Sequence, residues 1–455
     1  MTREMTPTKE LAEFVAAAEY GKIPQSVVEA SKLCLLDSIA CGLGGSDTSL
    51  GRTIVAVSSN LGKARQSTII GAGGKASCVH AAFANTSLMN MLDYDDTYDG
   101  AGHPGNTVVS PALAVGEMRH VAGKELITAI VLGYEVSIRL GLATRPSPKR
   151  LKDVFPVGHY ALGAAAATCK LLGFDAKHTA HAFGLAASGA PIPLPESKLS
   201  ERPMGWMKSG IGFNSVTGIM GAFLAEEGAT SWQTILDGKA GFWKMIGSDR
   251  CNFDRITRGL GEEYGICDTS FKPYPCCRYA HTTLDAVRSI VEQHNIRRAD
   301  IDKITVSTIS LVKFMADYRP RSMVDAQFSL PYMISMCVTS KTPGPRWFEQ
   351  SNLSSEKVLR IASKVRINTD FSADRLHDSD RALIPATVRI LTKQGKTVTE
   401  HIDKPRSLAV EEVKDKFRRI SGSILGREKG ERIARVIERI DEIRNISRFA
   451  GLLGR

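Results

Sequence analysis

The sequence contains no pair of cysteines in a C-x-x-C spacing, although it has nine cysteines in 455 residues. An odd number of scattered thiols does not make a disulfide framework, and without paired spacing they match neither a zinc ribbon nor an iron–sulfur cluster. We therefore expect free thiols in a reducing compartment, the cytoplasm. The nine are Cys34, Cys41, Cys78, Cys169, Cys251, Cys267, Cys276, Cys277 and Cys337.

Long apolar segments are scarce as well. The first residues, MTREMTPTKELAEF, contain no apolar core of signal-peptide length, and no later run is expected to be long enough to span a bilayer. These absences predict a protein without a membrane partner.

No stretch interleaves basic residues with stacking aromatic residues, although the formal net charge is +11, from 59 Lys+Arg and 48 Asp+Glu. The densest basic segment, residues 414–444, mixes both signs and carries an apolar face, which is typical of a solvated amphipathic helix. We therefore expect no nucleic-acid partner. The positive surplus can instead steer small anionic substrates to a pocket.

The first half of the chain has apolar residues at helical spacing in one segment after another. One of these segments is expected to start near Ser110, a possible N-cap, with Pro111 in its first turn. Small residues are dense in "ALGAAAAT" and "GLAASGA", a composition that lets helices approach closely in a buried bundle. The pattern changes near residue 265, where alternation predicts strands at 302–310 and 364–370 and a hairpin at 386–402 that turns at Gln394-Gly395. Helical spacing returns at 407–420.

These patterns predict a mainly α protein with a large all-helical domain and an inserted, smaller α+β lid domain. The expected boundaries are 1–265 for the first part of the helical domain, 266–404 for the lid, and 405–455 for C-terminal helices that return to the helical domain. A cleft between two such bodies is a natural ligand site.

One short stretch, "LDYDDTYDGAGHPG" at residues 92–105, combines four aspartates with a histidine. An EF-hand loop that begins at Asp95 would need a bidentate Glu at its twelfth position, where this chain has Asn106. A local transition-metal site would need further His or Cys residues near His103, and none follows at short spacing. The ordinary alternative is a polar loop whose aspartates form turns and cap helices. Because the preceding helix is apolar enough to be buried, Asp93 can instead emerge into a protected cavity, where a carboxylate needs partners.

Three later residues could supply such partners. His159 begins a small-residue helix, Lys208 precedes a glycine-rich helix, and Lys272 lies at the expected domain junction. Taken singly, the histidine has the features of a core residue and each lysine those of a surface charge.

Five motifs in order resemble the MmgE/PrpD family over nearly the whole chain. They are "AAFANTSLMNMLDYDDTYDGAGHPG", "GHYALGAAAATCKLLGFD", "MKSGIGFNSVTGIMGAFLAEEGAT", "SFKPYPCCRYAH" and "DAQFSLPY". The resemblance implies a helical domain with a smaller α+β lid, a homodimer, and catalysis without a metal or organic cofactor. The family includes 2-methylcitrate dehydratase, cis-aconitate decarboxylase and iminodisuccinate epimerase activities, all on small di- or tricarboxylates.

Carried over motif by motif, the resemblance implies six active-site positions: Asp93, Thr97, His103, His159, Lys208 and Lys272. Lys208 and Lys272 are the expected cations that bind substrate and neutralise its charge, His159 or His103 the acid or base, Asp93 the group that orients a histidine, and Thr97 a substrate-binding hydroxyl. Asp95, Asp96 and Asp99 are interpreted as loop and capping residues. Two positions depart from the family pattern: Asn90 stands where a histidine is common, and Gly105 where a serine is common. Both are expected to bear on substrate choice.

The sequence therefore predicts a cofactor-independent lyase that transfers a proton next to a carboxylate, in first place a 2-methylcitrate dehydratase-type hydro-lyase. Epimerisation (an isomerase) and decarboxylation (a carboxy-lyase) are the alternatives, since all three share the proton-transfer step. A rival of another class is a ligand-binding homologue that keeps the fold without the chemistry.

Overall fold

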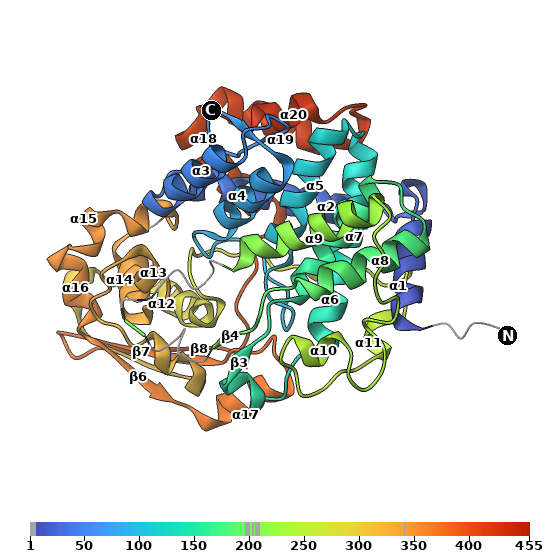
Figure 1. Ribbon diagram of the computed structural model, residues 1–455. Coiled ribbons are helices and arrows are strands. Elements are labelled where there is room, and N and C mark those ends of the chain that lie inside the picture. The colour runs from blue at the N-terminus through green and yellow to red at the C-terminus, as the bar shows by residue number, and fades with distance from the viewer. Residues whose placement is uncertain (1–5, 196–200, 203, 205–209, 341) are drawn as a thin grey trace.

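The computed structural model describes residues 6–195, 201, 202, 204, 210–340 and 342–455. Figure 1 shows a large helical body beside a smaller part that contains a sheet. The mainly α fold expected from the sequence is confirmed. That the smaller part acts as a lid stays a prediction, as do the domain boundaries.

The helical body is built from the first half of the chain. Its helices are α1 (Pro7–Ala17), α2 (Gln25–Ser46), α3 (Ser49–Leu61), α4 (Cys78–Asn90), α5 (Pro104–Arg119), α6 (Gly123–Ala143), α7 (His159–Leu171), α8 (Ala176–Ser188), α9 (Ile211–Glu226), α10 (Phe242–Met245) and α11 (Asp254–Thr257). Two short antiparallel pairs connect them, β1 (Ser67–Thr68) with β2 (Lys75–Ala76) and β3 (Val154–Phe155) with β4 (Leu194–Pro195).

Helix α6 lies at the centre of this body. Contrary to the sequence-based expectation, it is long and apolar enough by composition to cross a bilayer, the one such helix among the described residues. Its apolar window is 94% buried inside the protein, where the helix packs against α5 and α7. A helix that is apolar on all sides can be buried in this way in the core of a large body.

Small residues let α6, α7 and α9 pack closely, and close packing was expected for the "ALGAAAAT" segment of α7. A Cβ atom on Gly163 of α7 would lie 2.8 Å from the Cβ of Ser137 and 2.9 Å from the carbonyl oxygen of Gly133, both on α6. On the other side of α7, a Cβ on Gly218 of α9 would lie 2.5 Å from the Cβ of Ala164. At these distances the helices have no room for larger side chains.

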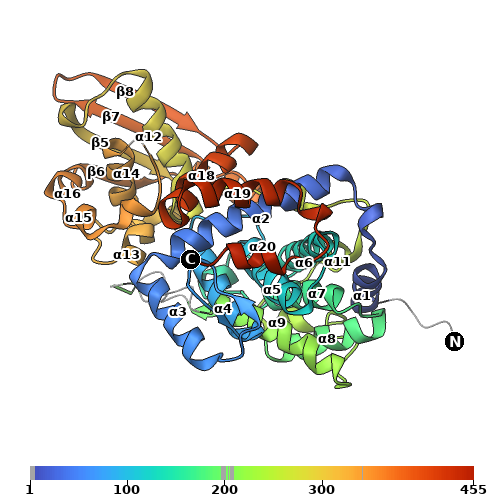
Figure 2. The ribbon, with the colours of Figure 1, turned by 90° about the horizontal axis from the view of Figure 1, so that it is seen from above.

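The smaller part is built on a four-stranded sheet of order β6-β5-β7-β8. β5 pairs parallel with β6 and antiparallel with β7, and β7 forms the expected hairpin with β8, turning through Gly395 at φ +82°. Figure 2 shows helix α12 lying along this sheet. The elements of this part are α12 (His281–Gln293), β5 (Ile301–Thr308), α13 (Met323–Gln327), α14 (Leu330–Thr339), α15 (Gln350–Leu353), α16 (Glu356–Ala362), β6 (Val365–Thr369), α17 (Phe371–Ser379), β7 (Ala386–Thr392) and β8 (Thr397–Ile402).

The C-terminal helices return to the helical body, where α18 packs against α2 and α20 against α5. In Figure 2, α18 lies beside α2, on the side of the helical body that faces the sheet. These helices are α18 (Val410–Leu425), α19 (Arg427–Glu438) and α20 (Ser447–Leu452).

Helix α5 begins earlier than the sequence pattern indicated. A start near Ser110 was expected, with Pro111 in the first turn, but Pro104 occupies the first turn and Pro111 lies inside the helix. Proline fits the first turn because the N–H it lacks would have no partner there, whereas Pro111 leaves the carbonyl of Thr107 without its usual helical donor. The early start makes His103 the N-cap residue of α5.

Candidate active site

The stretch between α4 and α5 carries its acidic residues inward. Asp93, Asp95 and Asp96 are each at most 2% exposed. Asp93 has a φ of +50°, a left-handed conformation that is uncommon for a residue other than glycine. Such backbone persists where surrounding contacts hold it, and here they come from a lysine 179 positions later in the chain.

That lysine is Lys272, which is fully buried. Its Nζ donates to the Asp93 carboxylate Oδ1 at 2.5 Å and to the Asp93 carbonyl oxygen at 2.8 Å. Burial alone would lower the pKa of Lys272, but the carboxylates of Asp93 and Asp95 outweigh it, and the pKa is raised. Lys272 therefore stays charged. The segment is positioned by an antiparallel bridge in which Thr97 and Ser270 exchange two backbone hydrogen bonds of 2.8 Å.

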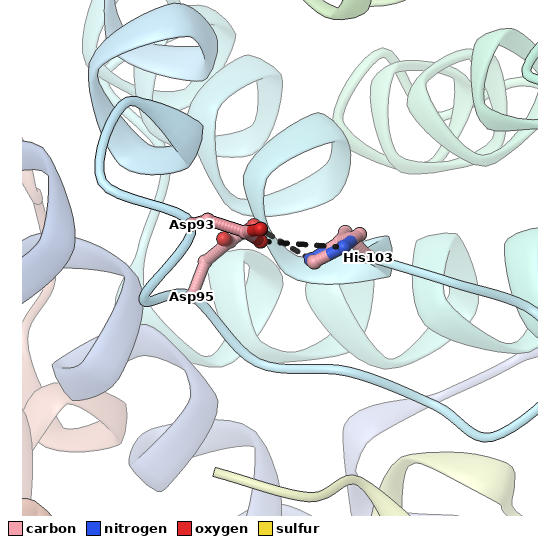
Figure 3. A group of neighbouring side chains, drawn as sticks. All are labelled: Asp93, Asp95 and His103. Atoms are coloured by element: carbon pink, nitrogen blue, oxygen red, sulfur yellow. Dashed lines mark ion pairs between the residues drawn. The ribbon is translucent and has the colours of Figure 1, made fainter. Parts of the chain in front are cut away.

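His103 completes the cluster. Figure 3 shows its ring pointing at the carboxylates of Asp93 and Asp95. Its Nε2 lies 3.8 Å from Asp93 Oδ1 and its Nδ1 lies 3.3 Å from Asp95 Oδ2. The backbone N–H of His103 donates to the hydroxyl of Tyr160 at 2.8 Å, which fixes the start of α5. The side chain is 23% exposed, so this ring forms the accessible side of an otherwise buried ion cluster.

Asp95 lies in the loop between α4 and α5, as interpreted from the sequence, and it is also part of this cluster. Its Oδ2 accepts from the side-chain amides of Asn90 and Asn106, both at 2.7 Å, and faces His103. Asn90, one of the two departures from the family pattern, thus contributes an amide donor to a site carboxylate. The sequence pattern did not reveal these contacts, because they depend on how the loop folds back between α4 and α5.

Asp96, another residue of this loop, is also fully buried. Its Oδ2 accepts from the Tyr134 hydroxyl at 2.7 Å. Burial raises the pKa of Asp96 to about 8, and the nearby Asp95 charge adds to the shift, so this carboxyl is mainly protonated at neutral pH. Asp99, by contrast, is half-buried.

Gly105 fits against this neutral acid. A Cβ on Gly105 would lie 2.3 Å from Asp96 Oδ1 and 2.5 Å from the Tyr134 hydroxyl. The second departure from the family pattern therefore makes room for the Asp96–Tyr134 pair.

His159 is buried at the start of α7. Its Nε2 is 3.2 Å from the carbonyl oxygen of Ala101, so that nitrogen carries the proton and donates it, and its ring lies 4.1 Å from the Tyr160 ring. Burial lowers the pKa of His159 to about 4, which keeps the ring neutral at neutral pH. Nδ1 is buried and has no partner among the described residues, so it is left as an acceptor.

The remaining two expected site residues are Thr97 and Lys208. The hydroxyl of Thr97 is buried and has no partner in the described ranges, so it remains able to bind a substrate oxygen. Lys208 lies outside the described residues.

The ligand atoms of Asp93, Asp95 and His103 lie within 4.8 Å of one another, close enough to hold a metal ion. The contacts of the two carboxylates argue for another arrangement. Asp93 Oδ1 already binds the Lys272 ammonium at 2.5 Å, and Asp95 Oδ2 already accepts two amide hydrogens. A divalent cation bound at Asp93 would lie close to the Lys272 ammonium and be repelled by it, so this lysine argues against a metal ion here.

A second buried lysine lies beneath the same loop and was missed at the sequence level. Lys416 of α18 is fully buried, with its Nζ 2.8 Å from Asp37 Oδ1 of α2 and 2.6 Å from the carbonyl oxygen of Tyr94. No local pattern marks this pair, because its members are 379 positions apart (416 minus 37).

Comparison with known proteins identifies the family of this chain. Residues 9–253 match the MmgE/PrpD N-terminal domain and residues 274–442 the MmgE/PrpD C-terminal domain. The chain is 25% identical to a cis-aconitate decarboxylase of Aspergillus terreus, over 98% of this chain and 95% of that protein. It is 24% identical to the cis-aconitate decarboxylase of Homo sapiens, over 98% and 94%. It is also 24% identical to the cis-aconitate decarboxylase-like protein oryM of Aspergillus oryzae, over 99% and 98%. The two domain matches together cover most of the sequence, and the chain therefore belongs to the MmgE/PrpD family.

Proposed function

We propose that this protein is a lyase that breaks a bond next to a carboxylate in a small di- or tricarboxylate. Its preferred reaction is the decarboxylation of a cis-aconitate-like tricarboxylate. The named relatives are decarboxylases, which favours this reaction over the dehydration that the sequence placed first. The observation that carries the proposal is the buried cluster in which Lys272 holds Asp93 and His103 faces both Asp93 and Asp95.

The reaction needs positive charge to stabilise the growing negative charge and a group that donates a proton. In such a decarboxylation the bond between a carboxylate carbon and its neighbour breaks, and carbon dioxide leaves. The remaining electron pair moves through the adjacent double bond to a carbon that bears another carboxylate, and that carbon takes up one proton. Negative charge thus grows on an already anionic molecule, so preorganised hydrogen-bond donors and cations lower the barrier.

His103 is the proposed proton carrier. It is the exposed member of the cluster, and its two ring nitrogens face carboxylates that can orient it and balance its charge. His159 is less suited to that role because its low pKa leaves it unprotonated near neutral pH. We assign His159 to accepting a hydrogen bond through Nδ1.

Lys272 has two parts in this scheme. Two of its three ammonium hydrogens are used on Asp93, and we assign the third to a substrate carboxylate. Thr97 is the proposed hydroxyl donor to substrate, and Lys208 stays the expected second cation.

Dehydration of a 2-methylcitrate-type hydroxy acid is the second candidate, and epimerisation of an iminodisuccinate-type acid the third. Either reaction removes a proton next to a carboxylate, and the same histidine beside the same cation can perform that step. Decarboxylation ranks first on the relatives alone.

The test is a panel of cis-aconitate, citrate, 2-methylcitrate and iminodisuccinate incubated with the enzyme in D₂O and followed by NMR. We expect cis-aconitate to lose carbon dioxide and the product to gain one deuteron on carbon. Loss of water from 2-methylcitrate alone would move the assignment to the second candidate. Binding of these acids without turnover or deuterium uptake would favour the non-catalytic homologue.

A paired variant tests the site itself. His103→Gln should lower kcat by about a hundredfold or more if His103 is a positioned acid. His178→Gln is the matched control, since His178 also contacts an aspartate, at 2.7 Å, but on the exposed surface of α8. Equal activity of the two variants would remove His103 from the mechanism.

Catalysis by side chains alone is part of the proposal. We expect dialysis against a chelator to leave kcat unchanged, and activity that is lost and then restored by a metal would overturn this point. The homodimer and the cytoplasmic location expected from the sequence stay predictions, to be checked by light scattering and by cell fractionation.

A further inference from the structure

The buried pair Lys416–Asp37 contacts the loop between α4 and α5 that carries Asp93 and Asp95. The Lys416 Nζ donates to the carbonyl oxygen of Tyr94, the residue between Asp93 and Asp95, and lies 3.8 Å from the centre of the Tyr94 ring. Asp37 Oδ1 balances its charge at 2.8 Å. Neither side chain is exposed.

Two buried ammonium groups therefore bind consecutive carbonyls of one loop. Lys272 binds the carbonyl of Asp93, and Lys416 binds the carbonyl of Tyr94. The Tyr94 hydroxyl also donates to the carbonyl of Pro273, next to Lys272, at 3.3 Å. The loop is thus held at two successive peptide groups from two parts of the chain, at the point where Asp93 adopts its left-handed conformation.

Stability alone is a weak reason for such a pair. A buried ion pair loses hydration energy comparable to what it gains by attraction, and an apolar pair of similar volume often stabilises a fold as well or better. What an apolar pair cannot do is hold a carbonyl oxygen at a fixed position. Because both site carboxylates flank that carbonyl, a shift of Tyr94 would move them relative to His103.

We propose that Lys416, supported by Asp37, is a positioning residue that holds the Asp93–Asp95 segment in the geometry that His103 needs. Lys416 touches no reacting group, and its charge is balanced by Asp37. This role makes the C-terminal helix α18 a working part of the site. The inference rests on the proposed function for its effect on turnover, but the placement of His103 can be measured without any substrate.

The central variant is Lys416→Met combined with Asp37→Asn, which removes both charges together and leaves no buried charge unpaired. Lys32→Met is the matched control. Lys32 of α2 also pairs with an aspartate, Asp441, at 2.9 Å and also donates to a backbone carbonyl, that of Glu438, at 3.0 Å, but away from the site.

The first measurement is the NMR signal of the His103 ring, labelled at Cε1 and assigned by its loss in His103→Gln. We expect this signal to shift in the double variant and to stay in place in Lys32→Met. The second is turnover of the substrate found in the panel. A misplacement of about 1 Å can cost on the order of a hundredfold in rate, so we expect kcat to fall between tenfold and a hundredfold with KM changed less.

A double variant with an unchanged His103 signal and wild-type kcat overturns the proposal. So does a loss of activity no greater than that of Lys32→Met at equal thermal stability. If the double variant does not fold, Lys416→Arg gives the second reading, because it keeps the ion pair but replaces the compact ammonium with a planar group. We expect a shifted His103 signal there too, and an unchanged one overturns the proposal. If the wild-type enzyme turns over no polycarboxylate, the proposed function fails by itself and the His103 signal still decides this inference.

Discussion

At the scale of single residues, Gly105 shows how one missing side chain shapes the site. Its hydrogen faces Asp96 and Tyr134 at distances that a Cβ cannot occupy. We predict that Gly105→Ser separates this pair and lowers the free energy of unfolding by about 1–3 kcal/mol, as overpacked buried positions do. Gly73→Ser is the control, because a Cβ on Gly73 meets no atom within 4 Å. Urea unfolding of both variants checks the prediction, and equal midpoints would contradict it.

Asp96 makes stability depend on pH. Its pKa of about 8 lies above the value of 3.8 that the unfolded chain has, so between those values the folded protein holds a proton that the unfolded chain has lost. The stability that this group contributes is therefore full below about pH 4 and is lost as the pH rises through 8. We predict that wild-type stability falls relative to Asp96→Asn across this window, by up to about 1.4 kcal/mol per pH unit. Urea titrations from pH 5 to pH 8 measure the difference, and parallel curves for the two proteins would refute it.

At the scale of elements, the contact between α6 and α7 depends on glycine. We predict that Gly163→Ala lowers the free energy of unfolding by about 1–3 kcal/mol, because its Cβ would meet both Ser137 and the Gly133 carbonyl of α6. Gly451→Ala in α20 is the matched control. Its Cβ meets nothing within 4 Å, and alanine there should be neutral or stabilising by up to about 1 kcal/mol. Thermal unfolding of the pair distinguishes a packing effect from a general effect of replacing glycine in a helix.

Elements were predictable from sequence where one local pattern decides them. The hairpin of β7 and β8 follows from alternation on both sides of Gly395, and the close packing of α7 from its small residues. The expected N-cap of α5 was wrong by seven residues (110 minus 103), because Pro104 and Pro111 each fit a first turn and the sequence does not say which is used. The site histidine His103 lies at the observed start of α5, as its N-cap residue.

At the scale of the whole molecule, contacts between segments that are far apart in the sequence were the hardest to predict. Asp93 and His103 lie in one short motif, so their partnership could be proposed, and the family resemblance strengthened the case for Lys272, which lies far away in the sequence. Lys416 meets Asp37 and Tyr94 only because α18 packs against α2. The contacts of Asp95 with Asn90 and Asn106 span only five and eleven residues, and they depend on the path of the loop between α4 and α5. Composition and spacing carry no signal for such pairs, which is why Asp95 and Asp96 were interpreted only as loop and capping residues.

The net charge of +11 leads to a prediction about substrate capture. A basic protein attracts a trianionic acid over a distance set by the Debye length, which shrinks from about 30 Å at 0.01 M salt to about 3 Å at 1 M. We predict that kcat/KM for a tricarboxylate falls several-fold over this range, while kcat changes little because the buried cluster is poorly screened. An acid with one carboxylate fewer should show a smaller decline, which separates attraction at a distance from damage to the fold. Stopped assays at five salt concentrations give the dependence of kcat/KM on salt for each of the two acids. Equal slopes for the two acids, or a fall in kcat that matches the fall in kcat/KM, would mean that the surplus charge serves something other than substrate capture.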